Sequence, residues 1–311
     1  MTGLRAETSE ALASFGLDPA DVLRAAATAL AEDLSGGPDV TTLATIPPGA
    51  TGRADVVSRA PGTVSGLVVA QAIFELVAAA ATGMGEAERF PVTCHQLVKD
   101  GDRVSAGQVL MTVEGNLRAM LTAERTALNF LCHLSGIATL TRRWVDAVIG
   151  TGTRVRDTRK TLPGLRGLEK YAVRCGGGVN HRMSLSDAAL IKDNHVAAAG
   201  SVTAALDAVR ELAPGVPVEV ECDTVEQVEE AVAAGAGLIL LDNFGVEEMR
   251  RAVELTAGRA LLEASGGLRL DVAATVAATG VDFIAVGALT HSAPVLDIGL
   301  DLAGSGRAAH D

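Results

Sequence analysis

The chain has 311 residues, of which 48% are hydrophobic and only 3% aromatic, and its formal net charge is −12. This length suffices for one large barrel or two domains around a core of Ala, Val, Leu and Ile. The acidic charge and the single Trp and Tyr argue against nucleic-acid binding and against anionic membrane surfaces.

The four cysteines lie about 40 residues apart and form no C-x-x-C pair, which argues against a zinc site and a disulfide framework. The start of the sequence lacks the charged and apolar regions of a signal peptide, and no apolar run reaches membrane-spanning length. We therefore expect a protein of the reducing cytoplasm.

The first part of the chain predicts a small α+β domain. Residues 1–35 carry apolar positions at helical spacing, with Asp18 and Pro19 at a helix start, and residues 36–42 read as a loop. A helix is expected over residues 70–81. Short β-like pieces surround it at 53–59, 62–69, 92–98 and 107–115.

A long helix is predicted from about Leu117 to Gly150, with a break at Ser135-Gly136. Apolar β runs then alternate with Ala-rich helices, which indicates parallel βα units whose polar residues gather at the carboxyl ends of the strands. The six runs are 154–158, 188–194, 217–222, 238–243, 260–265 and 283–288. With a possible seventh strand near Ser184, the pattern favours an incomplete barrel.

The fold class is therefore α/β: an incomplete α/β barrel with an N-terminal α+β sandwich domain. We place the N-terminal domain at residues 1–120 and the barrel at residues 121–290. Residues 291–311 are expected to pack back toward the N-terminal domain and to end in a frayed tail.

One segment of this acidic chain is cationic. From Arg154 to His195 it holds nine Lys/Arg and two His against four acids, and it contains three of the four lysines of the chain. A local cationic site attracts small anions by focusing the local field, and the alternative is a solvated basic face. Lys offers a compact point charge and Arg a planar fork, so the two are not interchangeable. The lysines in this segment of an arginine-rich chain therefore suggest that its chemistry requires a point charge.

Two pairs in this segment suit anionic ligands. Arg159 could bind a carboxylate through its fork, while Lys160 could hold a phosphate; alternatively they are a surface pair. The pair His181-Arg182 follows three glycines that allow close backbone approach to a ligand, or that simply make a flexible loop.

Lys192 ends an apolar strand, where it could be an anion ligand, a Schiff-base amine or a partner of Asp193 or Glu221. Glu221 and Asp242 end consecutive strands, where they could share Mg²⁺, contact sugar hydroxyls or satisfy the strand ends. Glu219 and Glu263 fit the same description, and spacing alone does not choose among the four acids.

Glycines follow the last two predicted barrel strands. Glycines before a helix start can cradle a phosphate with backbone N–H groups, and this is the usual phosphate position in such barrels. The two motifs are Ser265-Gly266-Gly267 and Val286-Gly287-Ala288.

Several long segments of the chain form a recognisable series: EDLSGGPDVTT, ERTALNFLCHLSGIATLT, the block from Asp157 to His195, EVECDT, LLDNF, EASGGL and VGALTHS. In this order they resemble the quinolinate phosphoribosyltransferase family, and the resemblance covers nearly the whole chain. Two departures are Cys132-His133 in place of Gln-Arg and GGPD where GYGD is common. The resemblance implies transfer of phosphoribosyl from phosphoribosyl pyrophosphate to quinolinate, with loss of pyrophosphate and CO2, giving nicotinate mononucleotide for NAD synthesis.

The resemblance also implies partners and site residues. It implies Mg²⁺ as cofactor and a homodimer, or a hexamer of such dimers, with shared active sites. Quinolinate would be held by Arg125 of the neighbouring subunit together with Thr158, Arg159, His181, Arg182 and Lys192. Phosphoribosyl pyrophosphate would be held by Lys160, Glu221, Asp242, Ser265, Gly266, Gly267, Val286, Gly287, Ala288 and His291, with Glu221 and Asp242 as metal ligands, directly or through water.

Three other readings remain open at the level of sequence. One is a related pyrophosphorylase for another nitrogen heterocycle. Another is a Schiff-base aldolase that uses Lys192. The third is a non-enzymatic scaffold or carrier built on residues 95–115, whose one lysine is Lys99. Lys170 has no ligand role that the residues support.

Overall fold

A computed structural model describes residues 4–82 and 91–303, and it divides the chain into two compact units. Unit 1 comprises residues 1–140, 163–176 and 293–311, and unit 2 comprises residues 141–162 and 177–292. These divisions differ from those expected at residues 120 and 290, because one helix runs past 120 and residues 163–176 group with unit 1. The predicted frayed tail lies outside the described residues.

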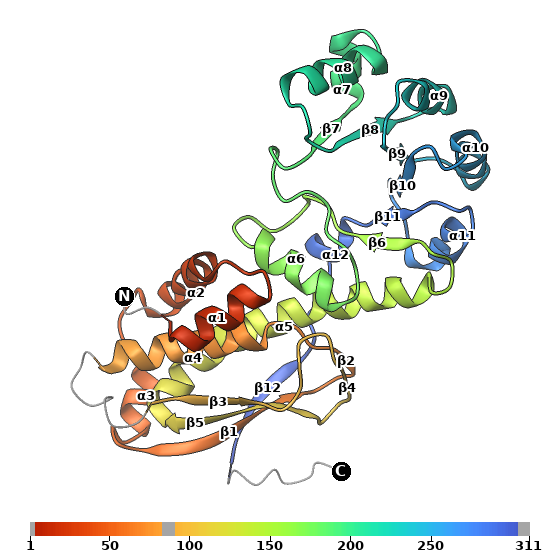
Figure 1. Ribbon diagram of the computed structural model, residues 1–311. Helices are drawn as coiled ribbons and strands as arrows, with labels where there is room; N and C mark the ends of the chain where they lie inside the picture. The colour runs from red at the N-terminus through yellow and green to blue at the C-terminus, as the bar shows by residue number, and fades with distance from the viewer. Residues whose placement is uncertain (1–3, 83–90, 304–311) are drawn as a thin grey trace. The chain divides into compact units, whose positions relative to one another are not determined.

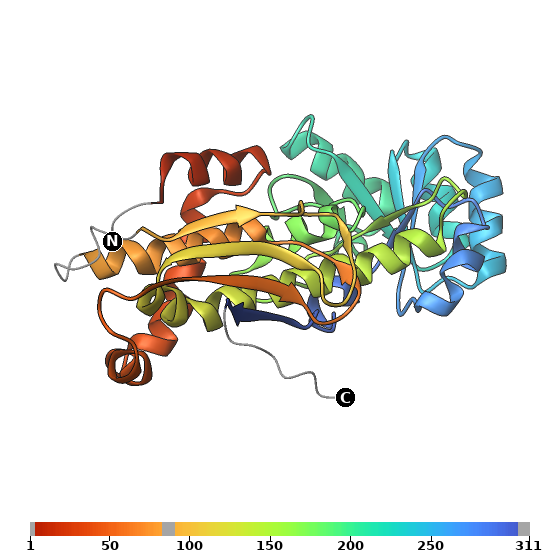
Figure 2. The same cartoon turned by 90° about the horizontal axis from the view of Figure 1, so that it is seen from below.

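Unit 1 is built on an antiparallel sheet with the strand order β12-β1-β5-β3. Its strands are β1 (Thr51–Ser58), β3 (Thr93–Gln96), β5 (Val109–Asn116) and β12 (Ile298–Leu302), beside a small pair β2 (Gly62–Thr63) and β4 (Arg103–Val104). β12 pairs with β1 from Ala54↔Leu302 to Ser58↔Ile298, so the C-terminal segment completes this sheet. Figure 2 looks onto these strands, with helices behind them.

The helices of unit 1 pack their apolar sides against one another and the sheet. They are α1 (Ala6–Ser14), α2 (Pro19–Leu34), α3 (Val40–Thr45), α4 (Leu67–Thr82), α5 (Leu117–Ala147), which continues into unit 2, and α6 (Arg166–Cys175). The Asp18 carboxylate accepts the Ala20 N–H and Pro19 follows it, as the predicted helix start requires.

Three local predictions for unit 1 are wrong. The loop predicted at 36–42 contains the start of α3, which Asp39 caps by accepting the Thr42 N–H. The strand predicted at 62–69 ends at Thr63, and α4 begins at Leu67. The Asp100 carboxylate, far away in sequence, accepts the N–H groups of Gly66 and Leu67 and so starts that helix.

The third correction concerns the break predicted in the long helix. α5 is continuous from Leu117 to Ala147. A Cβ on Gly136 would lie 2.2 Å from the Pro294 carbonyl oxygen, so this glycine serves close packing against the C-terminal segment.

Unit 2 is an open parallel sheet with the strand order β6-β11-β10-β9-β8-β7. The strands are β6 (Arg154–Arg156), β7 (Ala189–Ile191), β8 (Val218–Cys222), β9 (Leu238–Asp242), β10 (Leu261–Ser265) and β11 (Phe283–Ala285). They lie in an arc whose two edges, β6 and β7, do not pair, which confirms the predicted incomplete barrel (Figure 1). Among the described residues, those around Ser184 form bends rather than a seventh strand.

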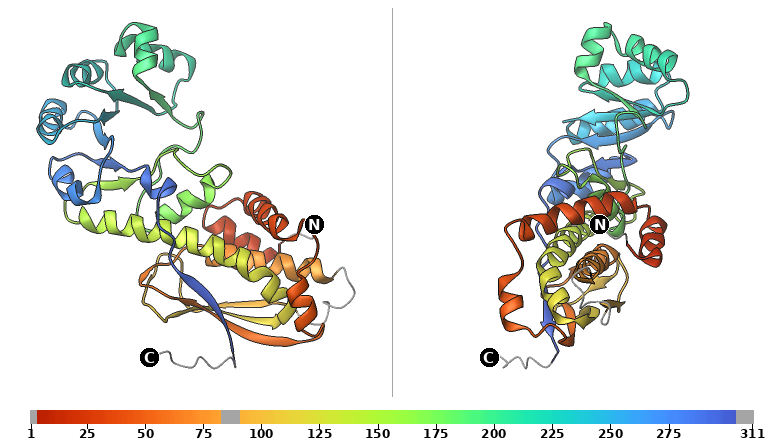
Figure 3. Two further views of the ribbon diagram at one scale, coloured as in Figure 1. Left: turned by 180° about the vertical axis from the view of Figure 1, so that it is seen from behind. Right: turned by 90° about the vertical axis from the view of Figure 1, so that its left-hand side faces the viewer.

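Helices line the outer side of this arc, and Figure 3 shows the same arrangement from behind. They are α8 (Val202–Leu212), α9 (Val225–Ala233), α10 (Val246–Thr256) and α11 (Ala273–Ala277). Unit 2 also contains the short helices α7 (Asp193–Ala199), η2 (Leu270–Val272) and α12 (Ala288–His291).

The strands of unit 2 present different residues to their two faces. On β8, Val220 and Cys222 are buried on the helix side, while Glu219 and Glu221 share the inner face. The inner face therefore carries charge, and the outer face carries the apolar core. No helix of the described chain is long and apolar enough to cross a membrane.

Candidate active site

The carboxyl ends of the unit 2 strands bring most of the predicted site residues to one edge of the sheet. The registers Ser265↔Asp242, Glu221↔Leu240 and Ile191↔Val220 align these ends. The residues that end or follow the strands are Thr158, Arg159 and Lys160 after β6, Lys192 after β7, Glu221 in β8, Asp242 in β9, Ser265, Gly266 and Gly267 at β10, and Val286, Gly287, Ala288 and His291 after β11.

Lys192 and Glu221 form an ion pair across the ends of β7 and β8. The Lys192 side chain is 45% exposed and that of Glu221 is 11% exposed, so the pair sits at the surface of the edge. A lysine there is held in place by a carboxylate yet remains open to an added anion. Of the partners considered from sequence, the structure selects Glu221.

Asn243 shapes the end of β9 and was missed by the sequence analysis. Its backbone has φ 57°, its N–H donates to the Ser265 carbonyl oxygen at 3.0 Å, and its side-chain amide donates to Asp242 at 2.7 Å. A Cβ on Gly266 would lie 2.3 Å from Asn243 Oδ1. Gly266, at φ 93°, is thus required for this packing as well as for its backbone conformation.

The loop after β11 brings Lys160 close to Gly287 and His291. A Cβ on Gly287 would lie 2.9 Å from Lys160 Cδ and 3.3 Å from His291 Nε2. The Thr290 hydroxyl donates to the Lys160 carbonyl oxygen at 2.7 Å, and the Thr158 hydroxyl accepts the Lys160 N–H at 3.0 Å. A lysine, a histidine and glycine backbone therefore converge at the predicted phosphate position.

Arg182 lies deeper than these residues. Its guanidinium donates to the Ala188 carbonyl oxygen at 2.8 Å, at the amino end of β7. Burial and the neighbouring charge of Arg159 lower the pKa of Arg182. The two guanidinium groups therefore lie close enough to repel each other, as expected for cations gathered to receive an anion.

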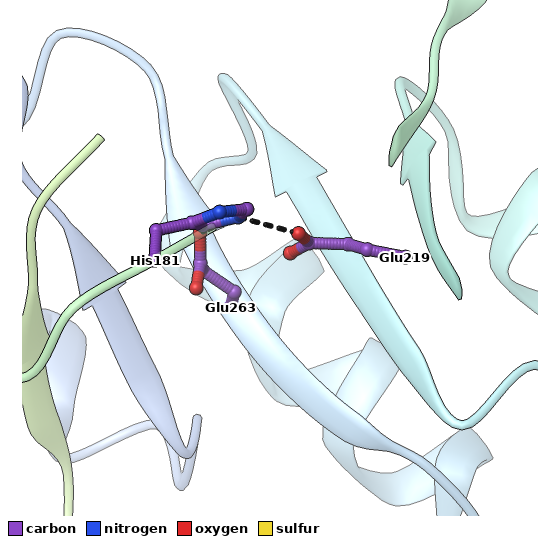
Figure 4. Close-up of side chains that lie close together, drawn as sticks. All are labelled: His181, Glu219 and Glu263. Atoms are coloured by element: carbon purple, nitrogen blue, oxygen red, sulfur yellow. Dashed lines mark hydrogen bonds and ion pairs between the residues drawn. The ribbon is translucent and has the colours of Figure 1, made fainter. Parts of the chain in front are cut away.

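A buried cluster of charged side chains lies one layer below this edge, on the inner face (Figure 4). His181 Nε2 lies 2.6 Å from Glu219 Oε2 and 3.8 Å from Glu263 Oε1. Arg156 donates to Glu263 Oε2 at 2.7 Å. Burial and the charge of Glu219 raise the pKa of Glu263. We call these four residues the inner cluster.

His181 is anchored on both sides of its ring. Its backbone N–H donates to Asp157 at 2.8 Å, and its Nδ1 accepts the Arg182 backbone N–H at 2.7 Å. An Nδ1 that accepts leaves the ring proton on Nε2, which donates to Glu219. In this conformation Nε2 faces Glu219 and Nδ1 faces the Arg182 backbone N–H.

The sequence analysis did not single out Arg156, and it listed Glu219 and Glu263 only as competitors of Glu221 and Asp242. The available signal was the V-E-V-E alternation of β8, which places Glu219 and Glu221 on one face. Spacing could not show which acid is buried, because burial depends on the neighbouring strands.

A cavity of about 440 Å³ reaches the inner cluster from the amino-end side of the strands. Its inner wall includes Arg156, His181 and Glu219. The rest of its lining is Arg182, Ala188, Leu206, Arg210, Gly215, Val216, Pro217, Val218, Gly237 and Leu238. The inner cluster thus lies between this cavity and the edge that holds the other candidate residues.

Two residues of interest lie in unit 1. Arg125 is exposed on α5, so its side chain is available at the surface of unit 1. Lys170 is fully buried in α6.

Models of two domains of one protein family match most of the chain. Residues 39–135 match the family described as quinolinate phosphoribosyl transferase, N-terminal domain, and residues 137–301 match the corresponding C-terminal domain. The chain is 54% identical over 280 residues to the nicotinate-nucleotide pyrophosphorylase (carboxylating) of Mycobacterium leprae (strain TN), covering 88% of this chain and 94% of that protein.

Solved structures with names from the same family have a similar fold. The crystal structure of NadC from Streptococcus pyogenes matches with a TM-score of 0.84 and 40% identity, over 92% of this chain and 98% of that one. The nicotinate-nucleotide pyrophosphorylase from Francisella tularensis matches with the same TM-score and 36% identity, over 91% and 96% of the two chains. The chain belongs to the quinolinate phosphoribosyltransferase family.

Proposed function

We propose that this chain transfers the phosphoribosyl group of phosphoribosyl pyrophosphate to quinolinate, with decarboxylation. The products are nicotinate mononucleotide, pyrophosphate and CO2, which makes the enzyme a pentosyltransferase of NAD biosynthesis. The observation that carries the proposal is the Lys192–Glu221 pair. It joins, at one sheet edge, a cation suited to a dicarboxylate and an acid suited to a sugar or its metal ion.

The cations divide between the two substrates. We assign Arg159, His181, Arg182 and Lys192 to the two quinolinate carboxylates, with Thr158 beside them. We assign Lys160 to the pyrophosphate, because its side chain lies against Gly287 in the glycine loop. The 5′-phosphate is assigned to the backbone and side chains of Ser265, Gly266, Gly267, Val286, Gly287, Ala288 and His291.

Mg²⁺ suits the two acids at the ends of β8 and β9. Glu221 and Asp242 supply hard carboxylate oxygens on neighbouring strands of the same face, and their present partners, Lys192 and Asn243, leave further oxygens available. Mg²⁺ typically binds one or two carboxylates and completes its coordination with substrate phosphates and water. Bound there, it would offset charge on the leaving pyrophosphate.

Positioning and charge explain the first step of the reaction. Departure of pyrophosphate leaves positive charge on the ribose, which Glu221 and Asp242 can stabilise directly or through the hydroxyl groups. The pyridine nitrogen is a weak nucleophile, so holding it in line with the ribose matters more than removing a proton from it. Each charged contact made mainly in the transition state contributes roughly 2–4 kcal/mol.

We further propose that the enzyme is a cytoplasmic homodimer, or a hexamer of dimers. Arg125 would reach the active site of the neighbouring subunit, a role compatible with its exposure on α5. The four cysteines are free thiols, as a reducing compartment allows.

The test is an assay of purified protein with quinolinate, phosphoribosyl pyrophosphate and Mg²⁺. We expect pyrophosphate, CO2 and nicotinate mononucleotide in equal amounts, and little product from nicotinate. Consumption of nicotinate alone would refute the dicarboxylate assignment. A Lys192 adduct trapped by borohydride with a sugar phosphate would favour an aldolase instead.

A further inference from the structure

The proposed reaction needs an acid that none of the assignments above supplies. When CO2 leaves, the bond from C2 of the pyridine ring to the carboxylate breaks and its electron pair stays on C2. Nicotinate mononucleotide carries hydrogen at that carbon, so a proton must reach C2 before CO2 recombines. This inference rests on the proposed function and asks where the proton comes from.

The residues assigned to quinolinate leave one suitable donor. Arg159 and Arg182 carry guanidinium groups, which do not give up protons in proteins. The Lys192 ammonium is held in an ion pair by the Glu221 carboxylate. His181 carries an imidazole, the side chain that most often serves as a general acid in enzymes.

The inner cluster is built to balance a charged His181. Glu219 on β8 and Glu263 on β10 are 3% and 0% exposed, and Arg156 on β6 donates to Glu263. A charged His181 would place a second cation against these two buried acids. Glu219 Oε1 and Glu263 Oε1 are buried atoms with no hydrogen-bond partner among the described residues, so the cluster has acceptor capacity to spare.

Glu219 also fixes the direction from which the proton leaves. It accepts from Nε2, so a protonated ring keeps that bond and carries its second proton on Nδ1. In this structure Nδ1 instead accepts the Arg182 backbone N–H, and the Asp157 carboxylate holds the His181 backbone N–H. This is the state expected after the Nδ1 proton has been given away.

We propose that His181 is the catalytic acid that protonates C2 after decarboxylation, with Glu219 and Glu263 as its positioning residues. The electron pair on C2 takes the Nδ1 proton of the imidazolium, and the N–H bonding pair stays on Nδ1. The neutral ring then accepts the Arg182 N–H as observed, and Glu219 keeps the ring oriented through Nε2.

Solvent restores the proton through the cavity behind the cluster. The cavity of about 440 Å³ is lined by His181, Glu219 and Arg156. Water there can reprotonate the ring without crossing the substrates. Until then Glu263 can take up a proton, because burial and the charge of Glu219 raise its pKa. The arrangement separates substrate entry from proton supply.

The test is a rapid-quench single turnover of His181→Asn in full-length enzyme, with saturating quinolinate and phosphoribosyl pyrophosphate. Pyrophosphate, quinolinate mononucleotide and nicotinate mononucleotide are quantified separately. We expect pyrophosphate release to persist while nicotinate mononucleotide forms at least about 100-fold more slowly, so that quinolinate mononucleotide accumulates. A fall of both products by the same factor would mean that His181 only binds substrate, and the proposal fails.

The control is His95→Asn, which makes the same change at an exposed position of β3 in unit 1 and should leave both rates unchanged. A second measurement needs no variant. In the wild type, the ratio of quinolinate mononucleotide to nicotinate mononucleotide should rise as pH is raised from 6 to 9, because a catalytic acid must carry its proton before it can give it to C2. A ratio that stays flat with pH overturns the proposal even if His181→Asn does not fold.

The two hypotheses fail separately. Absence of nicotinate mononucleotide with wild-type enzyme refutes the proposed function. A wild type that makes nicotinate mononucleotide, beside a variant whose two products fall together, refutes only the role of His181.

Discussion

His133, which with Cys132 replaces the Gln-Arg pair usual in the family, has a specific partner in this protein. Its Nε2 lies 2.8 Å from Oε1 of Glu169, whose side chain is fully buried in α6. The preceding Cys132 donates weakly to the Ile298 carbonyl oxygen at 3.6 Å. The altered pair thus serves packing within unit 1.

We expect His133→Ala to destabilise the fold by about 1–3 kcal/mol, because a buried carboxylate loses a hydrogen-bond partner. Urea unfolding followed by circular dichroism measures the change. His95→Ala, at an exposed position, should shift the midpoint far less. Equal shifts for the two variants would contradict a structural role for the His133–Glu169 contact.

Gly266 is constrained both by its backbone and by a neighbour. Gly266→Ala should lower kcat/KM for phosphoribosyl pyrophosphate at least about tenfold, because the new methyl group collides with Asn243 and displaces the loop that we propose binds the 5′-phosphate. Steady-state kinetics measures this. Gly258→Ala is the matched control: φ is 73°, and no heavy atom of the described residues lies within 4 Å of the added Cβ. It should cost about 1–2 kcal/mol of stability and leave kcat/KM unchanged.

Glu263 makes stability depend on pH in an unusual direction. Its ordinary pKa of 4.5 is raised in the folded protein, so the folded state binds more protons than the unfolded state between pH 4.5 and about 7. Its contribution to stability therefore falls as pH rises through this window. In Glu263→Gln we expect this fall to be absent when the free energy of unfolding is measured by urea titration at a series of pH values. Glu229→Gln, on the exposed side of α9, should retain it.

Among the elements, α5 shows how a residue that weakens a helix can be required by packing. Glycine inside a helix costs about 1 kcal/mol relative to alanine, and for this reason the sequence favoured a break in the helix at Ser135-Gly136. The Pro294 and Val295 backbone instead packs against Gly136. The same contact helps hold the segment that leads to β12.

Gly136→Ala should therefore destabilise unit 1 by about 1–3 kcal/mol in spite of its better helix propensity, because the methyl group overpacks the contact. Gly167→Ala, in α6, adds a methyl group with no heavy atom within 4 Å and should instead stabilise the protein by up to about 1 kcal/mol. Thermal and urea unfolding of both variants show whether each substitution raises or lowers the free energy of unfolding. A stabilised Gly136→Ala would show that the contact is unimportant.

For the whole molecule, the proposed dimer makes a sharp prediction. Arg125→Ala and Lys192→Ala should each abolish turnover while leaving the fold intact. Mixed dimers then contain one site that lacks neither residue, so a fully exchanged equal mixture should recover about a quarter of wild-type activity. Native mass spectrometry verifies the mixed dimers. Mixed dimers without activity would contradict shared sites.

Much of the fold was predictable because the signals were local. The six runs of unit 2 are apolar and separated by helices, and each became a strand of the parallel sheet in the predicted class of barrel. The errors arose where a distant group decided the outcome. Asp100 starts α4 from more than 30 residues away, and Pro294 explains a glycine in the middle of α5.

The sequence alone determined the fold class, the resemblance to the family and the cationic character of the segment from Arg154 to His195, because these follow from periodicity, residue order and charge. Only the tertiary structure decided which acids are buried. Glu219 and Glu221 lie two residues apart on one strand, yet one joins the buried inner cluster and the other pairs with Lys192 at the edge. Burial and partners depend on what neighbouring strands bring into contact, and no spacing along the chain encodes that.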